Sequence, residues 1–325
     1  MTRKSLLLSR SEVADALSMD DVLEVVQRVY VEFGNGQVVQ PDKITLDMSP
    51  MGLDAWHNAM PAYVHTMDAA GIKWAGGYAQ NRNHGLPYVM AVIVLQEPAT
   101  GYPLAVMDGS EITNMRTGAA AAVCAKLYAC ADSASIGFIG AGMQSRQTLD
   151  ALMCLWPMQH VRVSDINADA AASFKQEIER RHDVSVEVTD AKGVAASDII
   201  VTATFANEPL IFDDWVLPGA TIVSLGSFQE LEDECVLRMD RLAVDSWGQC
   251  SHRGELARLA EAGRIKESDV VSVCDTAAGK VAGRESDDER ILVVPVGLGA
   301  HDVALARVVH DRVIEKSGMS LDFLA

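Results

Sequence analysis

The hydrophobic and polar positions of the first third of the chain follow two different periods. From Val13 to Phe33 apolar residues recur at helical spacing and Gly34 follows them, which predicts one amphipathic helix. From Val38 to Met107 short β-rich runs are separated by clusters of Gly, Pro and Asn, which is typical of strands joined by turns. We therefore expect a helix followed by an antiparallel or mixed sheet.

Beyond Asp108 the pattern changes to strands that alternate with helices. The alanine-rich residues 113–129 predict a helix that begins near Ser110 or Thr113. Residues 135–139 then form an apolar run, which a glycine turn connects to another helical segment. Strands that alternate with helices favour a parallel sheet with right-handed crossovers. Later strands are expected at residues 161–165, 198–204, 220–226 and 241–245, and a last helix after Gly299.

Length and charge narrow the class of protein. The 325 residues have room for about two domains, because a single core seldom grows beyond about 250 to 300 residues. The net charge of −18 disfavours nucleic-acid partners, which are bound by clustered Lys and Arg. No apolar run approaches the roughly 20 residues that span a bilayer, and the first residues turn polar before a signal-peptide core could form. We expect a cytoplasmic protein with no nucleic-acid or membrane partner.

Neither the cysteines nor the histidines have the spacing of a metal site. The six cysteines include no Cys-x-x-Cys pair, so they are expected to be small buried thiols rather than disulfide partners or zinc ligands. The histidines also lack metal-ligand spacing, and the sequence predicts no metal. His84 and His301 are the two histidines that could line a substrate cleft, but neither is assigned a catalytic role.

A glycine turn between a strand and a helix indicates a dinucleotide site. Gly140 and Gly142 occupy the first two glycine positions of G-x-G-x-x-G, and Ser145 occupies the third. The first glycine permits the tight turn, and the second lets a pyrophosphate approach the N-terminus of the helix that begins near Met143. The alternative is a turn that merely joins the strand to the helix.

An acid at the end of the next predicted strand supports the dinucleotide interpretation. Asp165 is placed to accept hydrogen bonds from the adenosine ribose, which favours NAD over NADP, although NADP stays possible. Small residues at the ends of two later strands would let the dinucleotide cross the sheet. The candidate cofactor-binding residues are Gly140, Ala141, Gly142, Met143, Gln144, Asp165, Thr202, Ala203, Thr204, Ser224 and Gly226.

Two basic residues are candidates for the substrate site. Arg116 is expected in the first turn of its helix, where a cation opposes the helix dipole unless an anion joins it. A substrate carboxylate would be such an anion, and an internal salt bridge is the alternative. Lys73 lies in a strand-like run of apolar and small residues, where burial would lower its pKa and suit it to proton exchange with an amine or imine. A solvated strand face is the alternative for Lys73.

Several motifs together resemble the ornithine cyclodeaminase and mu-crystallin family. They cover most of the chain and are QPDKITL, NAMPAY, GIKWAGG, TGYPLAVMDGSEITNMRTGAA, IGAGMQSR, VTAT, HRGEL and GLGAHDVALA. The resemblance implies hydride exchange between a nicotinamide and the α-carbon of a small amino or imino acid. It identifies Arg116 as the carboxylate-binding arginine and Lys73 as the active-site lysine. The family's other arginine falls on Lys43, and a family glutamate falls on Asn58, which cannot act as a base.

One departure from the family pattern bears on the reaction. Cyclodeaminases carry an aspartate shortly after the last glycine of the dinucleotide domain, and that place holds Phe228 here. Glu230 could replace the aspartate only if the alignment shifted by about two residues. The resemblance therefore favours an amino-acid dehydrogenase or ketimine reductase. An ornithine or lysine cyclodeaminase and a mu-crystallin-like small-molecule binding protein are the alternatives.

The resemblance also implies the domain arrangement. The expected fold class is α/β, with a Rossmann-type doubly wound parallel sheet and an α+β domain for substrate binding and dimerisation. Residues 1–112 and 303–325 would form the substrate-binding domain, and residues 113–302 the dinucleotide-binding domain. The expected assembly is a homodimer.

Overall fold

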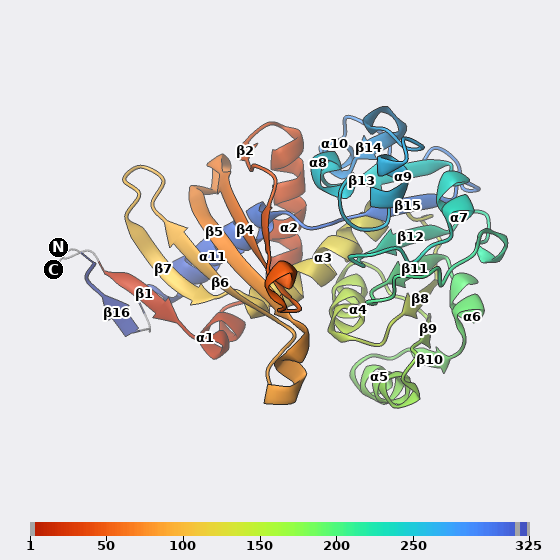
Figure 1. Ribbon diagram of the computed structural model, residues 1–325, viewed down its shortest axis with the longest axis horizontal. Helices are drawn as coiled ribbons and strands as arrows, with labels where there is room; N and C mark the ends of the chain where they lie inside the picture. The colour runs from red at the N-terminus through yellow and green to blue at the C-terminus, as the bar shows by residue number, and fades with distance from the viewer. Residues whose placement is uncertain (1–3, 316–318, 324–325) are drawn as a thin grey trace. The chain divides into compact units, whose positions relative to one another are not determined.

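The computed structural model describes residues 4–315 and 319–323 and divides into two units (Figure 1). Unit 1 comprises Met1–Arg116 and Leu298–Ala325, and unit 2 comprises Thr117–Gly297. The expected boundaries, after residues 112 and 302, therefore differ by a few residues. Residues 113–116 and 298–302 belong to unit 1, where Asp302 forms ion pairs with both Lys73 and Arg116.

Unit 1 is built on an eight-stranded mixed sheet, as the β-rich runs predict. Its strands follow the order β16-β1-β7-β6-β5-β4-β2, and β3 pairs with β4. Only the β1–β7 pair is parallel among these described strands. The strands are β1 (Ser5–Leu8), β2 (Val38–Val39), β3 (Ile44–Asp47), β4 (Ala55–Val64), β5 (Ala69–Tyr78), β6 (Val89–Gln96), β7 (Pro103–Asp108) and β16 (Met319–Leu321).

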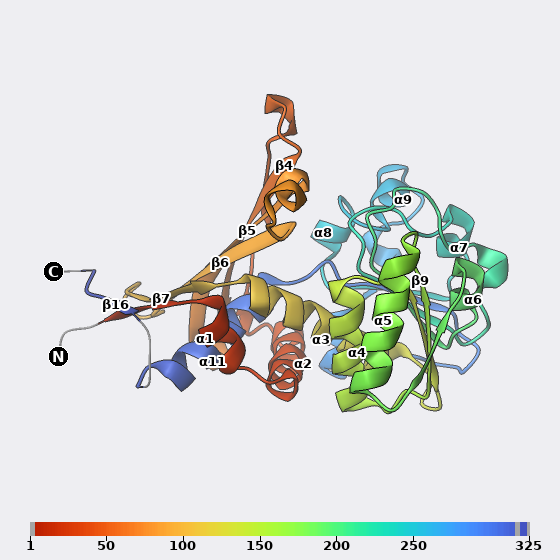
Figure 2. The same ribbon diagram turned by 90° about the horizontal axis from the view of Figure 1, so that it is seen from below.

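Helices cover one face of this sheet. Helix α11 (Gly299–Val313) packs on β4 and β5, and α2 (Met19–Gly34) packs on α11, so both lie on the same side of the sheet in Figure 2. Helix α3 (Ser110–Tyr128) begins in unit 1 and continues into unit 2. Short 3-10 turns follow three strands: η1 (Ser49–Met51), η2 (His65–Met67) and η3 (Ala79–His84).

The single helix expected from Val13 to Phe33 is wrong, because the segment forms two helices. The first, α1 (Arg10–Asp15), ends before α2 begins at Met19. Ser18 starts the second helix with a capping box: its hydroxyl accepts from Asp21 N, and the Asp21 carboxylate accepts from Ser18 N at 2.9 Å. This local cap satisfies backbone N–H groups that a continuous helix would have bonded internally. The spacing of apolar residues does not reveal the cap, so the break between the two helices could not be predicted from it.

Unit 2 is a parallel sheet, as the alternation of strands and helices predicts. Its order is β10-β9-β8-β11-β12-β15-β13-β14, and all its pairs are parallel. From β8 the strand order first runs outward through β9 and β10 and then in the opposite direction through β11 and β12, which is the doubly wound arrangement. The strands are β8 (Ser135–Ile139), β9 (His160–Ser164), β10 (Ser185–Val188), β11 (Ile199–Thr202), β12 (Thr221–Ser224), β13 (Arg241–Val244), β14 (Val270–Ser272) and β15 (Ile291–Val294).

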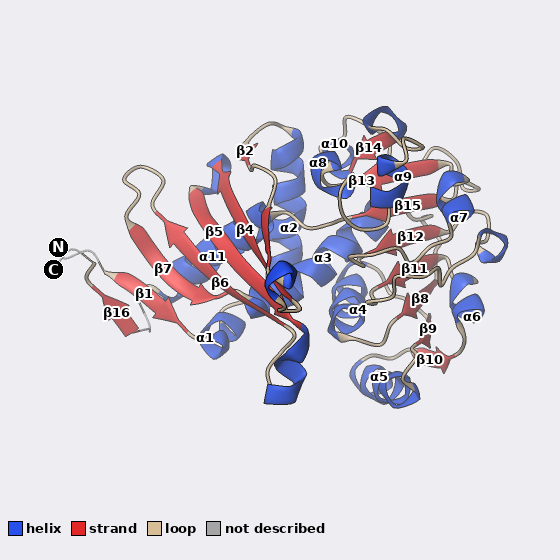
Figure 3. Ribbon diagram, viewed as in Figure 1, coloured by secondary structure: helices blue, strands red, loops and turns tan. Residues whose placement is uncertain are grey.

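Helices lie on both faces of the parallel sheet. In Figure 3, α4 and α5 lie on one side of its strands, and α6 and α7 on the other. None of the helices in the described parts of the chain is long and apolar enough to cross a membrane. The helical elements of unit 2 are α4 (Met143–Leu155), α5 (Ala168–Arg181), α6 (Ala191–Ala195), η4 (Asp213–Trp215), α7 (Asp233–Leu237), α8 (Trp247–Cys250), α9 (Ala257–Glu261), η5 (Glu267–Asp269) and α10 (Val273–Ala277).

Candidate functional site

Three charged side chains from distant parts of the sequence meet inside unit 1. Lys73 Nζ lies 2.7 Å from Asp302 Oδ2, and Arg116 Nε lies 3.1 Å from Asp302 Oδ1. The exposed fractions of the Lys73, Arg116 and Asp302 side chains are 1%, 8% and 0%. One buried carboxylate therefore binds two buried cations.

The alternation of β5 and a glycine in α11 explain why these side chains meet. Lys73 lies on the helix-covered face of the sheet, whereas its neighbour Trp74 is 42% exposed on the other face. Gly299 begins α11 directly against β4, where an added Cβ would lie 2.9 Å from Met60 O. Met60 is also the register partner of Lys73. The close approach that glycine permits thus brings the first turn of α11, with Asp302, next to Lys73.

The cluster carries more positive than negative charge. Burial, with the neighbouring Arg116 charge as the second cause, lowers the pKa of Lys73 to about 7, although Asp302 opposes the shift. Lys43 is half-buried, and its charge also lowers the pKa of Lys73. Burial alone would raise the pKa of Asp302, but Arg116 and Lys73 hold it below its ordinary value. Such a surplus of cations suits the binding of another anion.

The position of Arg116 differs from the expectation. Helix α3 begins at Ser110, so Arg116 lies in its second turn and not in its first. The anion beside it is the internal carboxylate of Asp302, as the salt-bridge alternative predicts, but this contact uses Nε. Among the described residues we find no hydrogen bond to the two terminal guanidinium nitrogens, which are the pair that grips a carboxylate in parallel.

Asp302 is the residue of this cluster that the sequence did not single out. An acid in the first turn of a helix is usually explained by the helix dipole. In the sequence, Asp302 stands out only as the acidic residue of GAHDVALA, which is apolar apart from His301. Asp302 differs from an ordinary acid at a helix start because it is fully buried. That burial depends on contacts with β5 and α3, which are remote in sequence.

Asn58 lies near the cluster. It is 5% exposed and lies opposite Ala75, two register positions from Lys73 and therefore on the same face of the sheet. Its Oδ1 accepts a hydrogen bond from Thr45 Oγ1 at 2.7 Å. The Asn58 amide group also carries two N–H donors, and Oδ1 can accept one further bond.

The two histidines considered from the sequence have different environments. His301 is fully buried beside Asp302, and its ring lies edge-on to Tyr30 at 4.6 Å. Burial, followed by the charge of Arg116, lowers the pKa of His301 to about 3. Its ring is therefore neutral near pH 7, and it packs against Tyr30. His84 ends the short turn η3 on the surface.

The glycine turn after β8 has the features that a pyrophosphate needs. Gly140 has a φ of +100°, and a Cβ there would lie 2.7 Å from Ala203 O. Gly142 precedes α4 with no side-chain cap, and a Cβ there would meet nothing within 4 Å. The first amides of α4, at Met143 and Gln144, thus face a space left open by Gly142. Met143 itself is exposed.

Ser145 and Asp165 complete this turn. Ser145 is fully buried and donates to Gly140 O at 2.5 Å, so its hydroxyl is used inside the loop. Asp165 follows β9 and accepts from Ala141 N at 2.7 Å and from Asn167 N at 2.8 Å. Each carboxylate oxygen can accept a second bond, which leaves capacity for ribose hydroxyls. These residues fit a dinucleotide.

The remaining candidate cofactor residues lie at the same edge of the parallel sheet. Thr202 is the register partner of both Ile139 and Ser224, so the three strands β8, β11 and β12 end together. Ala203 and Thr204 follow β11, and Gly226 follows β12. The carboxyl ends of parallel strands are where open α/β sheets bind ligands.

The loop after β12 contains the place of the cyclodeaminase aspartate. Phe228 is 47% exposed there. Glu230 is fully buried, and its Oε1 accepts from Thr204 N at 2.8 Å and from Thr204 Oγ1 at 2.6 Å. The carboxylate of Glu230 is therefore enclosed within unit 2, which disfavours the alternative in which Glu230 serves as the missing acid.

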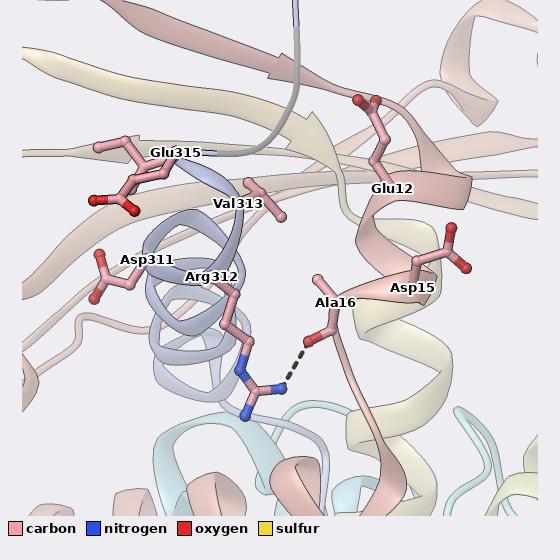
Figure 4. A pocket seen from close by; sticks show the side chains of 8 residues that line it. Glu12, Asp15, Ala16, Asp311, Arg312, Val313 and Glu315 are labelled. Atoms are coloured by element: carbon pink, nitrogen blue, oxygen red, sulfur yellow. Dashed lines mark hydrogen bonds between the residues drawn. The ribbon is translucent and has the colours of Figure 1, made fainter.

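A separate pocket in unit 1 lies between α1 and the end of α11 and contains none of these candidates (Figure 4). Its acids surround Arg312, which already donates to Ala16 O at 2.7 Å and binds Asp21. Among the described residues that line this pocket, Arg312 is the one cation, and it is already paired. No group of His, Cys, Asp or Glu able to hold a metal ion occurs among the described residues.

Comparisons with known proteins agree on one family. The model of the ornithine cyclodeaminase/mu-crystallin family matches residues 3–317. Alanine dehydrogenase of Archaeoglobus fulgidus is 35% identical over 319 residues, 97% of each chain. A solved archaeal alanine dehydrogenase dimer with bound NAD has a TM-score of 0.94 and 34% identity, covering 98% of this chain and 99% of that one. The Delta(1)-pyrroline-2-carboxylate reductase of Thermococcus litoralis, solved with NADH and L-proline, has a TM-score of 0.92 and 32% identity, covering 97% and 100%.

Proposed function

Because the chain belongs to the ornithine cyclodeaminase/mu-crystallin family, we propose that it is an NAD-dependent oxidoreductase that exchanges hydride with the α-carbon of a small amino or imino acid. The observation that carries this proposal is the buried cluster in which Asp302 binds Lys73 and Arg116. It combines the guanidinium group of Arg116, which can bind a carboxylate, with the amine of Lys73, which can transfer a proton. Relatives that act on alanine and on pyrroline-2-carboxylate support the substrate class.

Arg116 and Lys43 bind the substrate carboxylate in this proposal. The terminal nitrogens of Arg116 offer two parallel N–H donors, and Asp302 at Nε holds the guanidinium plane. Lys43 adds a point charge that is close enough to lower the pKa of Lys73. Asn58 lies two register positions from Lys73 on the same face and donates to a polar atom of the substrate through its amide N–H groups.

Lys73 exchanges the proton at the substrate nitrogen. In the direction of imine reduction its ammonium group donates a proton to the nitrogen, which makes the imine carbon more electrophilic. In amino-acid oxidation the neutral amine accepts that proton. A pKa of about 7 allows Lys73 to occupy both states near neutral pH.

The cofactor is bound by unit 2, at the edge formed by Gly140–Gln144, Thr202–Thr204, Ser224 and Gly226. When bound, the nicotinamide supplies or accepts the hydride. Asp165 accepts hydrogen bonds from the ribose hydroxyls and repels a 2′-phosphate, which favours NAD over NADP. The relatives solved with NAD and with NADH support this choice.

Two residues disfavour a cyclodeaminase. Phe228 has no ionisable group where cyclodeaminases are expected to carry an acid, and Glu230 is fully buried against Thr204. The chain thus lacks a base for a distal substrate amine at that loop. Ammonia release from ornithine or lysine with catalytic NAD⁺ would contradict this part of the proposal.

An assay of cofactor turnover tests the proposed function. We expect NADH oxidation with Δ1-pyrroline-2-carboxylate or with 2-oxo acids plus an amine, and NAD⁺ reduction with L-alanine or L-proline. Dinucleotide binding without turnover across this panel would instead favour a small-molecule binding protein. Absence of binding to either NADH or NADPH would overturn the proposal.

We also propose a homodimer formed through the outer face of the unit 1 sheet. Ile44, Ala59, Trp74 and Val92 form one cross-strand row on that face. Ile44, Trp74 and Val92 are 71%, 42% and 45% exposed, an apolar stripe that a second copy would cover. The archaeal relative solved as a dimer supports a second copy as the occupant. The cytoplasmic location stays a prediction.

A further inference from the structure

Two carboxyl groups are buried at the edge of unit 2 where the cofactor is proposed to bind. Glu230 is 0% exposed and lies in the loop after β12. Glu255 is 2% exposed and comes from the HRGEL segment, residues 252–256, for which the proposed mechanism has no use. Burial of a carboxyl group costs free energy unless its hydrogen-bonding capacity is satisfied, so the contacts of these two groups indicate what they do.

Glu255 closes the loop after β12. Its Oε2 accepts from Glu230 N at 2.8 Å, and its Oε1 accepts from Leu231 N at 3.0 Å. The other end of the loop is held to the neighbouring strand, where Leu225 N donates to Thr202 O at 2.8 Å. The short segment that carries Gly226 and Phe228 is therefore fixed at both ends.

Glu230 extends this connection to the end of β11. Its Oε1 accepts both the backbone N–H and the hydroxyl of Thr204. Its Oε2 lies against Gly226, because a Cβ added to that glycine would be 2.1 Å from this oxygen. A continuous set of contacts thus runs from Glu255 through Glu230 to both Thr204 and Gly226.

The charge state of the pair is consistent with such a buried connection. Burial, opposed by hydrogen bonds from the Glu230 and Leu231 amides and reinforced by the Glu230 charge, raises the pKa of Glu255 to about 8. Burial also raises the pKa of Glu230. The pair therefore retains a proton near neutral pH, which reduces the cost of burying it.

We propose that Glu255 and Glu230 are positioning residues for the dinucleotide. They hold Thr204, Gly226 and the Phe228 loop in the arrangement that binds the cofactor, although neither carboxylate touches it. This inference rests on the proposed function, because it assumes that the edge formed by β11 and β12 binds a nicotinamide dinucleotide. It assigns a role to the HRGEL segment: to supply the carboxylate that orders a cofactor-binding loop.

Titration with NADH tests the inference, with protein fluorescence or energy transfer to the bound cofactor as the readout. We expect Glu255→Ala to weaken NADH binding by about 10-fold or more, because two backbone N–H groups lose their acceptor. Glu255→Gln keeps one amide oxygen as an acceptor and should retain part of the affinity. Glu230→Gln should also weaken binding, since its amide oxygen replaces only one carboxylate oxygen.

Comparing the KM for NADH with the KM for the amino or imino acid distinguishes a positioning role from a merely structural one. The KM for NADH should rise in these variants while the KM for the amino or imino acid stays unchanged. Tyr128→Phe is the matched control, because it removes a buried hydrogen bond from the Tyr128 hydroxyl to Thr276. The backbone oxygen of Tyr128 accepts from Thr221 Oγ1 at the start of β12, which is the opposite end of that strand from Ser224. Tyr128→Phe should lower the melting temperature without changing NADH affinity.

The outcomes distinguish the two proposals. If wild type binds NADH and the folded Glu255 and Glu230 variants bind it equally well, the positioning role is wrong while the proposed function stands. If Glu255→Ala fails to fold, the NADH affinities of Glu255→Gln and Glu230→Gln test the positioning role instead. If wild type binds neither NADH nor NADPH, the proposed function fails and this inference fails with it.

Discussion

Lys73 Nζ lies 2.7 Å from Asp302 Oδ2 inside unit 1, and the second oxygen of the same carboxylate lies 3.1 Å from Arg116 Nε. Asp302 therefore sets the orientation of one cation relative to the other. Because its α11 helix comes from the far end of the chain, the proposed substrate site on β5 is complete only when that helix has docked.

Asp302→Asn should shift the pH dependence of imine reduction to lower pH. Lys73 must be protonated to donate, so wild-type kcat/KM should fall as the pH rises through about 7. Asp302 raises the pKa of Lys73, and its loss should move that fall downwards. A pH profile of kcat/KM measures the shift. Asp311→Asn, a more exposed acid on the same helix, is the control, and an identical profile for both variants would refute a role for Asp302.

Arg116→Ala should lower kcat/KM by about 100-fold, the usual loss when one preorganised donor to a developing or bound charge is removed. NADH affinity should stay unchanged, because Arg116 acts on the substrate carboxylate. Arg116→Lys should recover little activity, since an ammonium group cannot form the two parallel bonds. Steady-state kinetics with Arg10→Ala, an exposed arginine paired with Glu111, provides the comparison. Wild-type turnover in Arg116→Ala would remove it from the site.

Asp165→Ser should weaken NADH binding by about 10-fold, because charged hydrogen bonds to the ribose are lost. The same change removes the repulsion of a 2′-phosphate, so the preference for NADH over NADPH should shrink or reverse. Parallel titrations with both nucleotides measure the ratio. An unchanged ratio would show that another residue selects the cofactor.

Trp74→Glu should dissociate the proposed homodimer. The substitution places a charge in the centre of the apolar row formed with Ile44 and Val92. Light scattering coupled to gel filtration should give the mass of one chain for the variant and of two chains for wild type. Val188→Glu, at an exposed apolar position on the edge strand of unit 2, is the control and should stay dimeric. A wild-type mass of one chain would contradict the dimer.

Glu255→Gln should change how stability depends on pH. The pKa of Glu255 rises from 4.5 to about 8 in the folded protein, so the folded state binds its proton more tightly. The contribution of this bound proton to the free energy of unfolding is complete below about pH 4.5 and is lost as the pH rises towards 8. As the pH rises over this range, the free energy of unfolding measured in urea should fall for wild type but not for the variant, so their difference should shift in favour of the variant. Glu261→Gln, an exposed acid, should show no such trend, and a constant difference between Glu255→Gln and wild type would contradict the shift.

Local patterns predicted most of the element types, but not the terminal strands β1 and β16. The strand–glycine–helix order at Gly140 and Gly142 and the acid at Asp165 were predictable because each motif is complete within about 25 residues. The parallel sheet followed from the regular exchange of strand and helix periods. The break before Ser18 was missed, since a capping box lies within an unbroken apolar period.

The amino-acid order by itself determined the dinucleotide turn, the two kinds of sheet and the candidates Lys73 and Arg116, because period, glycine spacing and charge within an apolar run are local properties. Only the tertiary structure decided that Asp302 joins those two cations. It also decided that Glu230 is buried against Thr204 and Glu255 against the amides of Glu230 and Leu231. Burial and ion pairing depend on which distant segments pack together, and a carboxylate has no local mark that separates a buried partner from a solvated one.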